Sequence, residues 1–156
     1  EIAKQIQNKA KLNNCKIILP IDAVCSTDLN DEDSIRTCKI ENIFNEHMIL
    51  DIGEETSKLI SNEILKSRSV LWNGPLGAFE HKPFETSSVY VANTINKYCK
   101  NLQIKTMAGG GDTIALINLA KAKDGFDYLS NAGGAFLEWL EGNKSPGVLA
   151  LENNKI

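Results

Sequence analysis

The chain has 156 residues, of which 42% are hydrophobic and 24% charged, and a formal net charge of −3. Length and composition are those of one globular domain, and the negative balance argues against a nucleic-acid partner, which would need a basic face. No apolar run approaches the roughly 18 residues that span a membrane, and no signal peptide is recognisable. We therefore expect a cytoplasmic protein without a membrane partner.

The cysteines and histidines offer no obvious chemistry. No cysteine pair has metal-ligand or redox spacing, so we expect reduced, buried thiols at Cys15, Cys25, Cys38 and Cys99. The two histidines lie far apart in the sequence, and we expect no direct role in chemistry for His47 or His81.

The first third of the chain predicts one helix and three short strands. Ile2, Ile6 and Ala10 are spaced as the apolar face of a helix over residues 1–12. No capping residue precedes this helix, which indicates a cut through a larger protein. The strands are short apolar or weakly alternating runs, interrupted by a polar loop over 26–34, and are expected at 16–20, 21–25 and, near a sheet edge, 35–44.

From residue 48 onward, short apolar strands alternate with helices of about 12 residues. The strands are expected over 48–53, 69–72, 104–108 and 126–130. The helices are expected over 54–66, 84–100 and 114–122, with a last one that opens at 131–134 and ends near Gly142. This alternation predicts the α/β class, as a three-layer αβα sandwich around a mostly parallel, Rossmann-like sheet.

Three glycine-containing turns follow strands of this sheet, at Asn73–Glu80, Gly109–Thr113 and Asn131–Gly134. In a parallel sheet all three lie at the edge where the strands end, which is where ligands bind. Free N–H groups and a positive dipole make a helix N-terminus attractive to anions. The convergence of three such turns therefore predicts a phosphate-binding site.

The triple glycine at 109–111 has two interpretations that do not exclude each other. Asp112 can be the N-cap of the helix that follows a tight turn. Alternatively, the N–H groups of Gly110, Gly111 and Thr113 face phosphate oxygens while Asp112 holds Mg²⁺. Asp112 is therefore the candidate metal ligand.

The other two turns also have a structural and a functional interpretation. Gly133 and Gly134 can be loose packing at a helix start, or a second helix N-terminus aimed at a phosphoryl group in transfer. The turn from Asn73 can be a connection between two elements without a further function. Alternatively, Phe79 lines a base pocket and Glu80 accepts hydrogen bonds from ribose hydroxyls. Rossmann, Walker A and protein-kinase motifs are absent from the sequence.

Taken together, these motifs resemble the phosphoglycerate kinase family. The matching segments follow the order and spacing of the second half of its C-terminal, nucleotide-binding domain: 16–26, 70–80, 108–113, 130–135, 137–142 and 146–148. We therefore expect residues 1–156 to be a partial C-terminal domain that lacks the family's N-terminal substrate domain and the first part of its C-terminal domain. The alternatives are a stand-alone phosphate-binding module and a plain α/β scaffold.

The resemblance implies a reversible phosphoryl transfer in glycolysis, between 1,3-bisphosphoglycerate with ADP and 3-phosphoglycerate with ATP, assisted by Mg²⁺. It also implies an enzyme that is a monomer when complete and binds phosphoglycerate through the missing N-terminal domain. Gly111 and Gly134 would give N–H groups to the phosphoryl group, and Asp112 would help to hold the metal nucleotide. Nucleotide-binding residues are expected at Asn73, Pro75, Phe79, Glu80, Gly109, Gly110, Gly111, Asp112, Thr113 and Gly133.

Two departures from the family pattern bear on activity. The family's third turn commonly reads Thr-Gly-Gly-Gly-Ala-Ser, whereas this chain has Ala132 in place of a glycine and Phe136 in place of the serine hydroxyl. No lysine or arginine lies inside the three turns, although phosphoryl transfer depends on cations around the transition state. We therefore expect the chain to be inactive alone.

Overall fold

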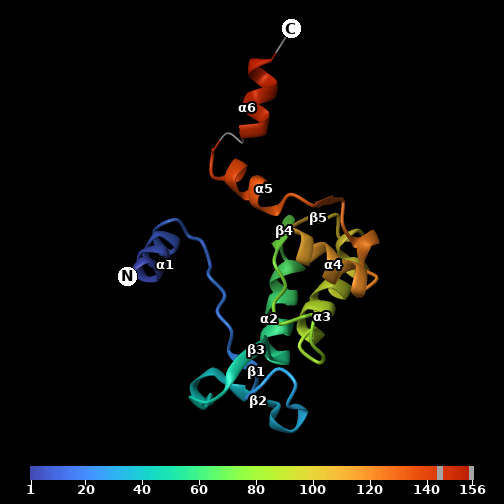
Figure 1. Ribbon diagram of the computed structural model, residues 1–156. Coiled ribbons are helices and arrows are strands. Elements are labelled where there is room, and N and C mark those ends of the chain that lie inside the picture. Colours follow the sequence, from blue (N-terminus) through green and yellow to red (C-terminus); the bar gives the residue numbers. More distant parts are fainter. Residues whose placement is uncertain (144–145, 155–156) are drawn as a thin grey trace.

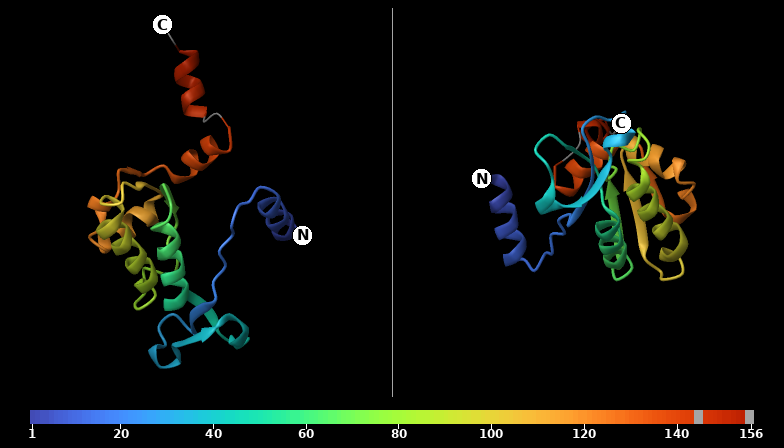
Figure 2. Two further views of the ribbon diagram at one scale, coloured as in Figure 1. Left: turned by 180° about the vertical axis from the view of Figure 1, so that it is seen from behind. Right: turned by 90° about the horizontal axis from the view of Figure 1, so that it is seen from below.

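The computed structural model describes residues 1–143 and 146–154. Helix α1 (Ile2–Leu12) forms as predicted, but none of its residues is buried and it stands apart from the rest of the chain (Figure 1, Figure 2). The strand predicted over 16–20 is wrong, because none of the described strands pairs with this segment to complete its hydrogen bonds. The segment is instead an extended arm that leads into the first strand.

A small antiparallel sheet follows this arm, with the strand order β2-β1-β3. Its strands are β1 (Asp22–Ser26), β2 (Arg36–Lys39) and β3 (Met48–Ile52), with 3-10 turns at Glu32–Ser34 and Ile40–Asn42. β2 lies at an edge as predicted, but it is shorter than the run over 35–44. The sequence pattern does not separate this sheet from the parallel one, because both consist of short strands with apolar or weakly alternating residues.

The parallel sheet has the strand order β4-β5-β6 and carries the three glycine turns. Its strands are β4 (Ser69–Asn73), β5 (Lys105–Gly109) and β6 (Tyr128–Ser130). Asn73 pairs with Gly109, and Gly109 pairs with Ser130, so the three strands end level with one another. The prediction of parallel strands with their turns at one edge is confirmed.

Helices flank the parallel sheet, which confirms the α/β class (Figure 1). They are α2 (Glu54–Ile64), α3 (Thr86–Thr94) with a π-helical turn (Ile95–Cys99), α4 (Gly111–Leu119), α5 (Gly133–Leu140) and α6 (Pro146–Asn153). A 3-10 turn at Lys123–Gly125 precedes β6. Among the described residues, no helix has the length and apolar character that crossing a bilayer requires.

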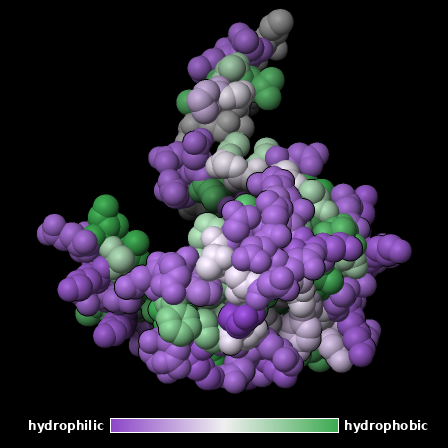
Figure 3. All heavy atoms as spheres, turned by 60° about the horizontal axis from the view of Figure 1, so that its bottom comes forward, coloured by the Kyte–Doolittle hydropathy of each residue, from purple (hydrophilic) through white to green (hydrophobic). Residues whose placement is uncertain are grey.

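One face of the parallel sheet packs against α2, α3 and α4. The chain steps from β4 to β5 and from β5 to β6 in the same direction, so right-handed crossovers place α3 and α4 on the same face. There Trp72 of β4 packs in a buried cluster with Ile95 and Leu116. On the opposite face Leu71 is 40% and Tyr128 57% exposed. Hydrophobic side chains are also exposed on the projecting helix α1 (Figure 3).

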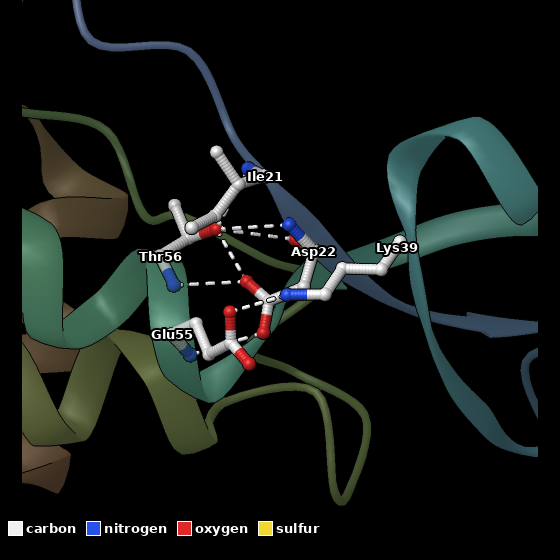
Figure 4. A network of polar contacts seen from close by, with 5 residues as sticks. All are labelled: Ile21, Asp22, Lys39, Glu55 and Thr56. Carbon is white, nitrogen blue, oxygen red and sulfur yellow. Dashed lines mark hydrogen bonds and ion pairs between the residues drawn. The ribbon is translucent and has the colours of Figure 1, made fainter.

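A buried carboxylate joins the small sheet to α2 (Figure 4). Asp22 accepts the N–H groups of Glu55 (3.0 Å) and Thr56 (2.8 Å) and the Thr56 hydroxyl, while Lys39 of β2 pairs with Glu55. Burial alone would raise the pKa of Asp22, but these hydrogen bonds and the Lys39 charge lower it below its ordinary value. A Cβ placed on Gly53 would lie 2.2 Å from Cγ of Asp22, so only glycine fits beside this cap.

Candidate functional site

The turns after β4, β5 and β6 meet at the edge where these strands end. A Cβ placed on Gly133 would lie 2.8 Å from the Cα of Gly110 and 3.0 Å from Oδ1 of Asn73. Each of these residues belongs to a different turn, so the three turns are packed together at one point. A Cβ placed on Gly109 would lie 3.5 Å from the Cα of Gly133, which extends the same contact. A side chain at Gly133 would have to displace backbone, so the close approach requires glycine there.

Gly110 needs glycine for its backbone conformation. Its φ is +100° at the N-cap position of α4, in a region that side chains rarely tolerate. Its N–H donates to the carbonyl of Ser130 (3.0 Å), and its own carbonyl accepts the N–H of Ile114 (3.0 Å). Gly110 therefore ties the turn after β5 to the end of β6 while it opens the helix. The expectation that its N–H faces phosphate oxygens is wrong, because the Ser130 carbonyl accepts that N–H.

Gly111 and Gly134 are exposed, and nothing lies within 4 Å of a Cβ placed on either residue. Neither appears among the described glycines with positive φ, so packing and conformation do not explain why these two are glycine. Gly111 is the first residue of α4 and Gly134 the second residue of α5. Backbone N–H groups at these positions have no partner inside their helix. Both therefore offer bare N–H donors beside the contact of the three turns.

Thr113 fixes the turn after β4 to the start of α4. Its side chain is buried, and its hydroxyl oxygen accepts the N–H of Gly74 at 2.7 Å. The Trp72 ring N–H donates to the carbonyl of Gly74 at 2.6 Å, and Gly74 has a φ of +95°. The sequence interpretation used only the backbone N–H of Thr113. It missed the hydroxyl because the two partners are 39 residues apart and no local pattern connects them.

Asp112 is exposed in the first turn of α4. Its interpretation as the N-cap is wrong, because Gly110 holds that position and no side chain caps the helix. A carboxylate here still suits the positive end of the helix dipole. In the described part of the chain, no three or more His, Cys, Asp or Glu side chains gather as a metal cage. Mg²⁺ is usually held by one or two carboxylates together with substrate phosphates, and an exposed Asp112 beside free N–H groups fits that arrangement.

The remainder of the turn from Asn73 is directed elsewhere. Pro75 lies over β3, where it lines a shallow pocket with Leu50. Phe79 is partly buried against the hydrophobic core, and Glu80 is exposed without a side-chain hydrogen bond or ion pair to any described residue. The structure therefore brings Asn73 to the glycines but connects neither Phe79 nor Glu80 to them.

A second buried carboxylate positions this turn. Asp51 of β3 accepts the N–H of Ser87 (3.0 Å) and the Ser87 hydroxyl at the start of α3. A Cβ placed on Gly77 would lie 2.4 Å from Oδ1 of Asp51, and the Ala78 N–H donates to the carbonyl of Leu50 (2.8 Å). Burial raises the pKa of Asp51 above its ordinary value. The small sheet thus holds the far end of the turn in place.

Comparison with known proteins gives the family of this chain. The sequence profile of the phosphoglycerate kinase family matches residues 1–143. This chain belongs to the phosphoglycerate kinase family. The phosphoglycerate kinases of Xanthobacter autotrophicus and Methylorubrum extorquens are 42% and 45% identical to it over 97% of the chain. The chain spans 38% of the length of each of these two relatives.

Solved phosphoglycerate kinases share the fold. The structure of the enzyme from Coxiella burnetii has a TM-score of 0.83 and 31% sequence identity, and the match covers 91% of this chain and 36% of that one. The enzyme from Pyrococcus horikoshii has a TM-score of 0.68 at 26% identity, over 85% of this chain and 32% of that one. The partial coverage agrees with the relatives' greater length.

Three lysines that belong to β5 or follow α4 lie far from the glycine turns. Lys105 begins β5 and Gly109 ends it, so the two are about 13 Å apart along the strand. Lys121 and Lys123 follow the C-terminus of α4, about 15 Å from its N-terminus. Of the third turn's departures, Ala132 is exposed and its N–H donates to the Ser130 hydroxyl (3.2 Å), whereas the side chain of Phe136 lies outside the described part of the structure.

Proposed function

We propose that this chain is the nucleotide-phosphate part of a cytoplasmic, glycolytic phosphoglycerate kinase, which transfers a phosphoryl group reversibly between 1,3-bisphosphoglycerate and ADP. The observation that carries the proposal is the contact of three turns at Gly133, Gly110 and Asn73. Two helices, α4 and α5, begin beside this contact. Their free N–H groups and dipoles favour a polyphosphate over a neutral ligand.

The proposed roles follow from exposure and contact. Gly111 and Gly134 donate their N–H groups to the phosphoryl group in transfer, because they are open whereas Gly109, Gly110 and Gly133 are packed. The nucleotide phosphates lie against the backbone of the packed turns, at Asn73, Gly109, Gly110, Thr113 and Gly133. The family resemblance adds Pro75, Phe79 and Glu80 on the nucleoside side, with Glu80 at the ribose.

Asp112 is the proposed ligand of the magnesium nucleotide. Mg²⁺ bound there supplies neutralisation of the charge that develops on the phosphate oxygens. The Asp112 carboxylate is exposed at the start of α4, one residue after the N–H of Gly111. The carboxylate would hold the cation, and the backbone N–H groups would hold the phosphates.

We further propose that residues 1–156 form part of a C-terminal nucleotide-binding domain, with the acceptor site for 3-phosphoglycerate on an N-terminal domain of a longer, monomeric enzyme. Two observations support this division. The chain spans only 38% of its curated relatives. Leu71 and Tyr128 are exposed on the face of the parallel sheet that lies opposite α2, α3 and α4. Exposed hydrophobic side chains on a sheet face are what we expect where further residues of a longer protein cover it.

Replacing Gly111 with proline tests the proposed donor while it keeps the helix. At the first position of α4 the fixed φ of proline fits, and its missing N–H has no helical partner to lose. In the complete kinase we expect Gly111→Pro to lower kcat by about 10²–10³, the usual cost of one lost oxyanion donor. Steady-state kinetics with ATP and 3-phosphoglycerate measure this change.

Gly111→Ala is the matched control, because it keeps the N–H and its Cβ has nothing within 4 Å. Its kcat should stay close to that of the unchanged enzyme. Equal losses for alanine and proline would mean that space, and not the N–H, matters at this position. A normal kcat for Gly111→Pro would remove Gly111 from the reaction.

A further inference from the structure

Two cysteines of the small sheet bring their thiols together. The Sγ atoms of Cys25 in β1 and Cys38 in β2 are 4.0 Å apart. Cys25 lies opposite Arg36 and Cys38 opposite Ala23 in the antiparallel register, so the two are diagonal neighbours on the same face of the sheet. Their separation of 13 residues carries no redox signature in the sequence, and only the fold reveals the pair.

The four thiols of the chain differ in access. Cys25 is 1% exposed, whereas Cys38 is partly exposed at the sheet edge. Cys15 in the arm is exposed, so the expectation that all four thiols are buried is wrong there. Cys99 is buried at the end of the π-helical turn. A reagent of peptide size can therefore reach Cys38 and Cys15 but not Cys25 or Cys99.

We propose that Cys25 and Cys38 are a reversible dithiol–disulfide pair, oxidised by low-molecular-weight disulfides such as glutathione disulfide. The Cys38 thiolate attacks one sulfur of glutathione disulfide, forms a mixed disulfide and releases one glutathione thiolate. The Cys25 thiolate then attacks the Cys38 sulfur and releases the second glutathione thiolate. Two protein thiols lose two electrons, glutathione disulfide gains them, and the two protons leave on the two glutathione molecules.

The second bond requires a small backbone movement, because diagonal neighbours are usually about 7–8 Å apart between their Cα atoms and a disulfide spans about 4.4–6.8 Å. A disulfide needs its sulfurs about 2.05 Å apart, so these two must approach by about 2 Å. β2 is a four-residue edge strand, and three of its four residues are exposed. Little packing therefore opposes a small movement of β2 toward Cys25.

The order of the two attacks follows from access and charge. Burial, together with the hydrogen bond and the charge of Cys38, raises the pKa of Cys25 to about 11. Cys25 is thus both shielded and a scarce thiolate, and the first attack belongs to Cys38. Once the Cys38 sulfur is part of a mixed disulfide, it carries no negative charge and no longer accepts the proton of the Cys25 thiol as a thiolate would. Two of the three causes of the raised pKa are then gone, which makes Cys25 a better nucleophile for the second step.

The experiment exposes the folded chain to glutathione disulfide, blocks free thiols by alkylation at low pH and maps the products by intact mass and non-reducing peptide analysis. We expect a Cys25–Cys38 cross-link with the loss of two hydrogens, glutathione on Cys15, and free Cys99. The same treatment in concentrated urea should lower the yield of the cross-link by about tenfold, because only the fold holds the thiols together.

Two single variants separate the steps. Cys25→Ser should stop the reaction at a stable glutathione adduct on Cys38, and Cys38→Ser should leave Cys25 free because no reagent reaches it. A wild-type product with glutathione on Cys38 and a free Cys25 would overturn the proposal. So would an equal yield of the cross-link in the folded and the urea-unfolded chain, since the link would then owe nothing to the 4.0 Å contact.

Discussion

At the scale of single residues, three different physical reasons explain why glycine occupies positions in the three turns. Gly110 adopts a positive φ, and Gly133 lies against the backbone of Gly110. Gly111 and Gly134 have free space around them and ordinary conformations, so the protein itself does not require them. The sequence predicts that the glycines matter but cannot divide them into these classes, because the division depends on contacts between turns. The proposal that the last two donate to a ligand depends on that division.

The Asp112→Ala substitution tests the proposed metal role at the same scale. In the complete kinase we expect it to lower kcat by orders of magnitude, because charge neutralisation in the transition state is lost. Stability should fall only by about 0.3–1 kcal/mol, the value of a charge at a helix N-terminus, because the Asp112 side chain caps nothing. Kinetics at saturating Mg²⁺ and urea unfolding measure the two effects. Asp112→Asn is the isosteric control, because it removes the charge and keeps the shape of the side chain. Near-normal turnover of both variants would exclude Asp112 as the metal ligand.

At the scale of elements, carboxylates from one strand organise the start of a helix elsewhere in the chain. Asp22 of β1 serves α2, and Asp51 of β3 serves α3. Their pKa values move in opposite directions. At Asp22 the hydrogen bonds from Thr56 and Glu55, with a smaller contribution from the Lys39 charge, together outweigh burial, whereas at Asp51 burial outweighs the hydrogen bonds. Ionised Asp22 therefore stabilises the fold, while the ionisation of Asp51 opposes it.

The pH dependence of Asp22→Asn tests this cap. The pKa of Asp22 is lower in the folded chain than its ordinary value of 3.8, so the unfolded chain binds more protons between the two values. The stability that the carboxylate supplies is complete above pH 3.8 and is lost as the pH falls through the folded value. We expect Asp22→Asn to cost about 1 kcal/mol at neutral pH.

Urea unfolding across this pH range measures the effect. The difference between wild type and Asp22→Asn should shrink on acidification through the folded pKa. Asp124→Asn is the control, because this carboxylate lies exposed on the 3-10 turn before β6, away from the cap. A difference that stays constant with pH would mean that the charge of Asp22 does not stabilise α2.

The elements also show where sequence periodicity succeeds and fails. The structure places α2, α4 and the strands of the parallel sheet close to their predicted positions. The spacing of apolar residues within each segment is enough to predict them. The strand expected over 16–20 has the same apolar signal, but no described strand supplies its hydrogen bonds. The predicted helix over 84–100 becomes α3 with a π-helical turn, a detail that local spacing does not encode.

At the scale of the whole molecule, the site was predictable because, in a parallel sheet, the order of strands and turns in the sequence determines where the turns lie. Three turns that follow parallel strands must share an edge, and the register of β4, β5 and β6 puts them there. Contacts that depend on the whole fold were not predictable. They include the bond between Thr113 and Gly74, the Asp22 cap of α2 and the thiol pair of the small sheet. Each joins residues from different elements whose spacing carries no motif.

The last prediction concerns the chain as an isolated molecule: we expect it to have no measurable kinase activity and to bind Mg·ADP weakly. Phosphoryl transfer depends on positioning and on cations around the transition state. The three turns contain no lysine or arginine. Lys105 lies at the end of β5 that is remote from the turns, and Lys121 lies beyond the end of α4 that is remote from them. A helix N-terminus contributes only about 1 kcal/mol toward an anion, which cannot hold two polyanions in line.

A coupled assay with ATP and 3-phosphoglycerate, alongside calorimetric titration with Mg·ADP, decides this prediction. The intact kinase is the positive control for both measurements. Turnover by the 156-residue chain near the ~1–100 s⁻¹ of typical kinases would show that it supplies its own cations and acceptor site. The division of the enzyme between this chain and further domains would then be wrong. Tight Mg·ADP binding without turnover would instead favour a phosphate-binding module that works without cations from further domains.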